Sequence, residues 1–294
     1  MTRTLVKFWG ARGSIPVPGP KTQVYGGNTS CVELRFGDTL FICDGGTGLR
    51  ELGLDLATRG TEPIEAHMLF SHTHWDHIQG FPFFVPAYAA QSRLLVYEPA
   101  ERNGQMHRLL LGQMRSEYFP VGFADLGAEI IPRSMEQGST VIAGINVQYW
   151  DQQHPGGSYA YAFDFDGANV VYATDNELDH RLLDFERSLG APEALRRFPQ
   201  DELERIAGVD LLIADAQYTE EEYPSHRGWG HARAWTVVDW ALQAGVRKLA
   251  LFHHDPMQSD EQIAAKVDSC RQRAAQAGSS IEIFAAHDGL CLEL

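Results

Sequence analysis

A cluster of three histidines and one aspartate lies within the stretch Ser71–His77, directly after a short apolar run. Burying several polar groups beside a hydrophobic strand is costly unless they have partners, and a metal ion would supply one. His72 and His74 are two residues apart, so in an extended chain they point the same way. Asp76 and His77 are expected to begin a helix whose N-terminus faces the same point. Four ligands divided two and two favour a pair of metal ions over a histidine-rich solvated turn, which is the alternative interpretation.

Three further polar residues follow predicted strands. They are His154 after Val147–Trp150, Asp175 after Asn169–Thr174, and His253 after Lys248–Phe252. Ligands in α/β sheets commonly lie where strands deliver their last residues. Each of the three would by itself be more typical of a structural residue, an aspartate after a strand being a common turn residue. Taken together with the first cluster, they supply the ligands that complete the coordination spheres of two metal ions.

Alternating strands and helices must position these residues. The predicted strands, besides the three named above, are Leu5–Trp9, Cys31–Phe36, Thr39–Cys43, His67–Phe70, Leu94–Tyr97, Tyr159–Phe165, Leu211–Ala214 and Leu290–Leu294. The predicted helices are Leu49–Thr58, Ala234–Ala244 and one that begins after Ser259 and ends at Gly278. Ser259 and Gln262 form a capping-box pattern, which is typical of a helix start. The charged segment 178–208 is interpreted as a helical excursion within one domain spanning residues 1–294, because no linker or repeat is evident.

Bulk composition excludes several classes of protein. The 294 residues are 44% hydrophobic but contain no run of 18 apolar residues, which argues against a membrane span. The first residues lack an apolar signal core, so we expect a cytoplasmic protein with four reduced cysteines. The net charge of −15, without a visible cluster of lysine and arginine, argues against a nucleic-acid polymer as partner. A small anionic substrate stays compatible, because a metal site dominates its own local field.

The segment His72–His77, together with His154, Asp175 and His253, resembles the metal motifs of the metallo-β-lactamase fold superfamily. The order and spacing match along essentially the whole chain. The resemblance implies an α/β fold of αββα sandwich type, in which two packed mixed β-sheets carry helices on their outer faces. It says less about the substrate, because one fold hosts many reactions.

The same resemblance assigns roles to the metal-binding residues. It implies one ion held by His72, His74 and His154, a second ion held by Asp76, His77 and His253, and Asp175 as the bridging ligand. Asp44, at the end of an earlier strand, is expected to contact one of the metal-binding side chains and fix its orientation without binding the ion itself. Of the neighbours His253 and His254, strand alternation sends the two rings to opposite sides. We expect His253 to be the ligand, because it directly ends the apolar strand.

Other stretches of the sequence indicate which branch of the superfamily the chain resembles. Asp215, at the end of a predicted strand, and His231, before a predicted helix, resemble the Glu/His dyad of ribonuclease Z-like phosphodiesterases, with aspartate in place of glutamate. The alternative interpretation is that His231 lies at the start of a helix and has no catalytic role. The segments Phe8–Pro16 and Gly26–Cys31 are also similar to members of this branch, which include cyclic nucleotide phosphodiesterases of the anti-Pycsar type.

These observations predict a binuclear metal-dependent phosphodiesterase, a phosphoric diester hydrolase. The expected reaction is hydrolysis of 3′,5′-cyclic nucleotides, or similar small cyclic phosphodiesters, through a hydroxide that bridges the metals. The expected catalytic residues are His231, Asp215 and Asp76, with Phe81–Phe84 or Trp229 stacking on the base. Two Zn²⁺ ions suit the N/O ligand set best, with Mn²⁺ or Fe²⁺ as alternatives, and the resemblance suggests a homodimer. The alternative functions are tRNA 3′-end processing and a thioesterase or lactonase reaction on the same fold.

Overall fold

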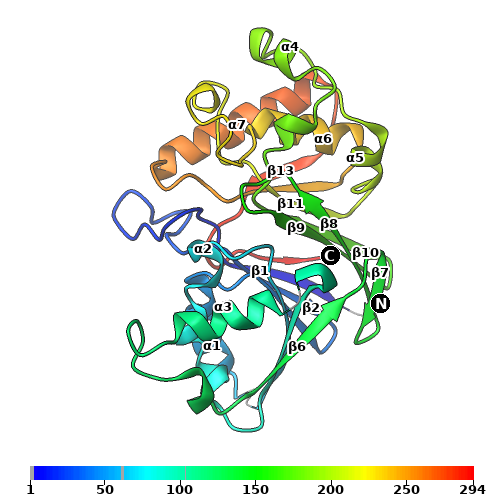
Figure 1. Cartoon of the computed structure of the whole chain (residues 1–294). Coiled ribbons are helices and arrows are strands. Elements are labelled where there is room, and N and C mark those ends of the chain that lie inside the picture. Colours follow the sequence, from blue (N-terminus) through cyan, green and yellow to red (C-terminus); the bar gives the residue numbers. More distant parts are fainter. Residues whose placement is uncertain (1–2, 61–62, 103) are drawn as a thin grey trace.

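Two seven-stranded β-sheets face each other in the computed structural model, which describes residues 3–60, 63–102 and 104–294 (Figure 1). The first sheet has the order β14 (Cys291–Glu293), β1 (Thr4–Gly10), β2 (Cys31–Phe36), β3 (Thr39–Cys43), β4 (Glu65–Leu69), β5 (Arg93–Pro99), β6 (Glu129–Met135). The second sheet has the order β13 (Glu282–Ala285), β12 (Lys248–Phe252), β11 (Leu211–Asp215), β10 (Ala168–Ala173), β9 (Ser158–Phe165), β8 (Ile145–Gln152), β7 (Ser139–Ile142). Each sheet is mixed: β3 to β6 and β10 to β13 pair in parallel, and the remaining neighbours pair antiparallel.

Helices cover the outer faces of both sheets. The α-helices are α1 (Gly48–Thr58), α2 (Trp75–Ile78), α3 (Gln105–Gln113), α4 (Phe185–Gly190), α5 (Gln200–Glu204), α6 (Ala234–Gln243) and α7 (Asp260–Gln276). Short 3₁₀ helices occur at Phe81–Phe83, Val85–Tyr88, Ala100–Arg102, Phe123–Asp125, Leu178–Arg181 and Tyr223–Ser225. One apolar cluster fills the space between the sheets, a second joins α6 and α7 to the second sheet, and a third joins α1 and α3 to the first. This confirms the predicted αββα sandwich.

The segment 178–208 connects β10 to β11 and is helical only in short pieces, because Gly190, Pro192 and Pro199 interrupt it. It does not project as a separate arm, since Phe198 and Ile206 pack in the same cluster as α6. The capping box at the start of α7 is present as predicted, with Ser259 accepting from the Gln262 N–H. Among the described residues, no helix combines the length and apolar character needed to cross a membrane.

The arrangement of strands brings distant residues to one edge of the sandwich. β3 and β4 are parallel in the first sheet, and β10, β11 and β12 are parallel in the second. The polar residues that directly follow these strands, or close them, therefore meet at the same end of both sheets. They are Asp44, the His72–His77 segment, Asp175, Asp215 and His253, and His154 joins them from the turn after β8.

Candidate metal centre

The loop after β4 turns sharply into the short helix α2. His74 is extended and stands at the N-cap position, and the His77 N–H donates to the His74 carbonyl at 3.0 Å. Asp76 and His77 therefore lie on the first turn of a helix, as the sequence predicts. Asp76 and His77 are buried, as is His72 at the start of the loop.

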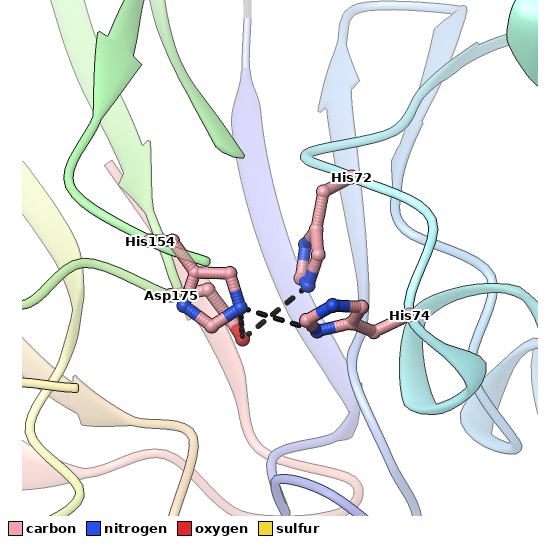
Figure 2. A group of neighbouring side chains, drawn as sticks. All are labelled: His72, His74, His154 and Asp175. Carbon is pink, nitrogen blue, oxygen red and sulfur yellow. Dashed lines mark hydrogen bonds and ion pairs between the residues drawn. The ribbon is translucent and has the colours of Figure 1, made fainter. Parts of the chain in front are cut away.

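One group of side chains joins this loop to the second sheet (Figure 2). The ligand atoms of His72, His74, His154 and Asp175 all lie within 4.8 Å of one another. His154 Nε2 lies 3.1 Å from His74 Nδ1, and Asp175 Oδ2 lies 3.5 Å from His72 Nε2. Burial lowers the pKa of both His72 and His154, which favours the neutral imidazoles that metal ions require.

A second group shares Asp175 with the first. The ligand atoms of Asp76, His77, Asp175 and His253 also lie within 4.8 Å of one another. Asp175 Oδ1 is 3.2 Å from His77 Nε2 and 3.2 Å from His253 Nε2, whereas its other oxygen faces the first group. Burial raises the pKa of Asp175, but the imidazoles around it, His253 first, bring its pKa well below the usual value. One ionised carboxylate thus offers one oxygen to each group.

The donor set fits a pair of divalent cations. In the described part of the chain, the buried atoms His72 Nε2 and His77 Nε2 make no hydrogen bond of acceptable geometry, although Asp175 oxygens lie 3.5 Å and 3.2 Å from them. Orphaned buried nitrogens are costly, and a metal ion in each group would satisfy one of them. The atoms are all nitrogen and oxygen, a set that Zn²⁺, Mn²⁺ and Fe²⁺ accept.

Residues behind these groups fix the ring orientations. Asp44 Oδ2 lies 2.8 Å from His77 Nδ1 and also accepts the Tyr172 hydroxyl at 2.6 Å. Gln217 Oε1 lies 3.1 Å from His253 Nδ1, and the Gly230 carbonyl lies 2.9 Å from His154 Nδ1. Partners of this kind set the tautomer and direction of a ligating histidine.

The neighbours His253 and His254 point to different places. His253 Nε2 lies 3.1 Å from Asp76 Oδ2, inside the second group. His254 is fully buried elsewhere, with its Nε2 donating to the Ala286 carbonyl at 3.0 Å. The geometry therefore brings His253, and not His254, to the candidate centre.

His231 and Asp215 form a buried pair beside the two groups. His231 Nδ1 lies 2.7 Å from Asp215 Oδ2, and the His231 ring stacks on His253 at a centroid distance of 4.9 Å. Asp215 is held in turn by the backbone N–H groups of Asn176 and Gln217. Burial lowers the pKa of His231, but Asp215 more than offsets this and raises that pKa to about 9. Without bound ions, the imidazole is therefore protonated at neutral pH.

An open cleft of about 450 Å³ exposes the candidate centre to solvent. Its lining consists of Ser14, Thr73, His74, Trp75, Asp76, Asp175, His231 and His253. Trp75 is 64% exposed, whereas Phe81 and Phe84 are fully buried in the core under α1. The expectation that Phe81–Phe84 stack on a base is therefore wrong for those two rings, because their apolar surface packs against the first sheet. Trp229 is 61% exposed.

Sequence reasoning missed several residues that the structure places at the site. The Ser14 N–H donates to Asp76 Oδ2 at 2.7 Å, and Gln217 and Trp75 also take part as described above. Trp75 could have been found from its place between His74 and Asp76. Ser14 and Gln217 act through contacts with residues distant in the sequence, for which the chain carries no local signal.

Gly230 offers a sharp test of how His154 is held. It has a φ of +93°, and a Cβ there would lie 2.2 Å from His154 Nδ1. We expect Gly230→Ala to displace the His154 ring and to weaken metal binding in the first group by at least tenfold, measured by titrating metal-free protein. The control is Gly144→Ala, in the turn between β7 and β8, with a φ of +84° and nothing within 4 Å of its Cβ, which adds backbone strain alone. Equal metal affinities in the two variants would contradict this account of His154.

Comparisons with known proteins agree with this fold. The family model described as "Beta-lactamase superfamily domain" matches residues 39–254. A protein named ribonuclease Z from Haloarcula marismortui is 24% identical over 322 residues, covering 97% of this chain and 95% of that protein. The metallo-β-lactamase fold protein YhfI from Bacillus subtilis superposes over 100% of both chains with a TM-score of 0.69 at 16% identity. A diphosphatase of the PhnP family superposes over 99% of this chain and 98% of that chain, with a TM-score of 0.66 at 18% identity.

Proposed function

This chain belongs to the beta-lactamase superfamily domain family and is a hydrolase of the metallo-β-lactamase fold, and from that premise we propose that it is a binuclear metal-dependent phosphodiesterase acting on small cyclic phosphodiesters such as 3′,5′-cyclic nucleotides. The observation that carries the proposal is the pair of ligand groups sharing Asp175, with the His231–Asp215 pair beside them. Bound divalent ions would activate a water molecule and offset the charge on the phosphate oxygens. We propose Zn²⁺, and take Mn²⁺ and Fe²⁺ as the alternatives that metal analysis would distinguish.

Three side chains of the protein have the remaining roles in the proposed reaction. Asp76 lines the cleft as an ionised carboxylate, because His77 lowers its pKa against the effect of burial, and it can accept a hydrogen bond from the attacking water. His231 also lines the cleft, and its Nδ1 is committed to Asp215, so its Nε2 is the atom that can donate a proton to the leaving alkoxide. Asp215 holds the ring in the orientation and charge state that this transfer needs.

The His231–Asp215 pair supports a phosphodiester over a thioester, whereas a lactone, which also expels an alkoxide, is separated by assaying it beside the phosphodiester. An alkoxide leaving group needs a proton, and His231, whose Nδ1 lies 2.7 Å from Asp215 Oδ2, has its Nε2 left to supply one. A thiolate leaving group needs far less help, because thiols ionise several pKa units below alcohols. The relative named ribonuclease Z and the structural neighbour named a diphosphatase both have names of enzymes that act at phosphorus. Turnover of a p-nitrophenyl phosphodiester without turnover of a thioester would support this choice, and the reverse would remove it.

The cleft favours a small substrate. None of its described lining residues is a lysine or arginine, and the chain carries a net charge of −15. A polymer would require several phosphate contacts, which this cleft does not offer, whereas a cyclic nucleotide has a single phosphodiester that two ions can hold. The exposed Trp75 in the cleft offers a flat surface for a base. The second candidate is precursor-tRNA processing, favoured by the curated relatives named ribonuclease Z.

We expect measurable hydrolysis of cyclic mononucleotides, weak dependence on ionic strength, and negligible cleavage of precursor tRNA. An enzyme that neutralises several phosphates would instead lose affinity steeply with salt, by about 0.9 in the log–log slope for each duplex phosphate contact. Both substrates are assayed with metal-loaded protein across a range of salt concentrations. Efficient, salt-sensitive trimming of precursor-tRNA 3′ ends without action on cyclic nucleotides would replace this proposal with the second candidate.

A further inference from the structure

Glu177 is a buried carboxylate that belongs to neither ligand group. Its side chain holds the segment 223–230 in place beside the site. Glu177 lies in the turn after β10, two residues beyond Asp175, and is 2% exposed. Its Oε1 accepts the Tyr223 hydroxyl and the Gly228 N–H, each at 2.7 Å, and its Oε2 accepts the Gly230 N–H at 2.9 Å. Both carboxylate oxygens are therefore used to fix the segment 223–230.

The backbone N–H of Glu177 contacts the residue that precedes the metal-ligand candidate His154, so Glu177 also acts on His154 from a second side. The Glu177 N–H donates to the Gln153 carbonyl at 2.7 Å, directly before His154 in the chain. The Gly230 carbonyl, which Glu177 positions through the neighbouring N–H, lies 2.9 Å from His154 Nδ1. Glu177 thus closes a ring of contacts around His154, with its backbone on residue 153 and its side chain on residue 230.

We propose that Glu177 is a positioning residue that orients His154 toward the first metal ion and sets the place of His231. His231 directly follows Gly230, so the contact that fixes Gly230 also fixes the start of the segment that carries His231. Three hydrogen-bond donors converge on the two oxygens of Glu177, and His180 Nε2 also lies 3.3 Å from Oε1. Only a carboxylate can accept all of the donors without presenting a donor of its own. A glutamine there would turn an NH₂ group toward at least one N–H or O–H. This inference rests on the proposed two-metal site.

The test is stepwise titration of metal-free protein with Co²⁺, followed by visible absorption and calorimetry. We expect Glu177→Gln to weaken one of two binding events by about tenfold, the lower end of the effect of losing a direct outer partner of a ligand, because Glu177 acts on His154 through Gly230, and to leave the other event unchanged. The weakened event should be the one that His154→Ala removes. Tyr223→Phe, which deletes one of the three donors, should give a smaller loss in the same event.

Glu202→Gln is the matched control, since Glu202 is equally buried at 2% exposure but pairs with Arg181 and Arg205, away from the site. It should leave both Co²⁺ affinities unchanged. A folded Glu177→Gln protein with wild-type affinity for both ions would overturn the inference, as would equal weakening of both ions. If Glu177→Gln does not fold, unchanged affinities in Tyr223→Phe would overturn it. Wild-type protein that binds no Co²⁺ pair would overturn the proposed function itself, which separates the two failures.

Discussion

Replacing Asp175 by alanine is expected to reduce the metal content below two ions per chain and to abolish turnover. Its two oxygens face different ligand groups, 3.5 Å from His72 Nε2 and 3.2 Å from His77 Nε2. Losing an outer partner of a ligand already costs about 10–100-fold in metal affinity, so losing a shared carboxylate should exceed that. Removing a buried negative charge also leaves the surrounding imidazoles to repel each other when protonated. Metal content after dialysis and turnover of a phosphodiester are the measurements.

Asp164→Ala, at an exposed position on β9, is the control and should keep both ions.

Two variants at the neighbouring residues His253 and His254 extend the test. His253→Ala should weaken binding in the second group only, whereas His254→Ala should retain both ions in the protein that folds. Two tightly bound ions in His253→Ala, combined with loss of one in His254→Ala, would reverse the assignment of this doublet.

Replacing His231 by alanine is expected to leave the metal content intact and to lower kcat by roughly 10²–10⁴, the usual contribution of a general acid. The loss should be large for alkyl leaving groups, such as the ribose oxygen of a cyclic nucleotide. It should be small for p-nitrophenolate, which leaves without a proton. The measurement is kcat of wild-type and variant protein across phosphodiesters of graded leaving-group pKa.

Asp215→Asn should show the same leaving-group pattern with a smaller loss, because the imidazole stays in place but loses the carboxylate that raises its pKa. An equal loss for good and poor leaving groups would count against the acid role of His231. Loss of metal in His231→Ala would instead indicate a ligand, since Asp215, His231 and His253 also lie close enough together to hold an ion.

Much of the site was predictable because its residues follow strands of strongly apolar character. The seven predicted metal-binding residues come together in two groups, although only the first four are close in sequence. Parallel pairing of β10, β11 and β12 explains why Asp175 and His253 meet: each comes directly after, or one residue beyond, a strand of the same direction. The choice of His253 over His254 followed from the place of His253 directly at the end of the apolar strand, whereas side-chain alternation predicted only that the two rings point apart.

Other features had no local signal. β6 contains Pro132 and exposed residues, which obscure a strand in the sequence, but it lies at the edge of the first sheet where proline is tolerated. β7 and β13 are short strands at the edges of the second sheet and were not predicted, and neither was α3. The contacts of Ser14 with Asp76 and of Glu177 with Gly230 join segments more than 50 residues apart through backbone N–H groups. Any residue type has such a group, so the sequence cannot reveal these contacts.

The most direct test of the central claim is a metal titration of chelator-treated protein, followed in the same samples by turnover of bis-(p-nitrophenyl) phosphate and of a cyclic mononucleotide. We predict that two divalent ions bind per chain and that turnover of both substrates rises in step with the second ion, because both ligand groups share Asp175. Full phosphodiesterase activity in metal-free protein, or two bound ions without turnover of either substrate, would contradict a binuclear metal-dependent phosphodiesterase.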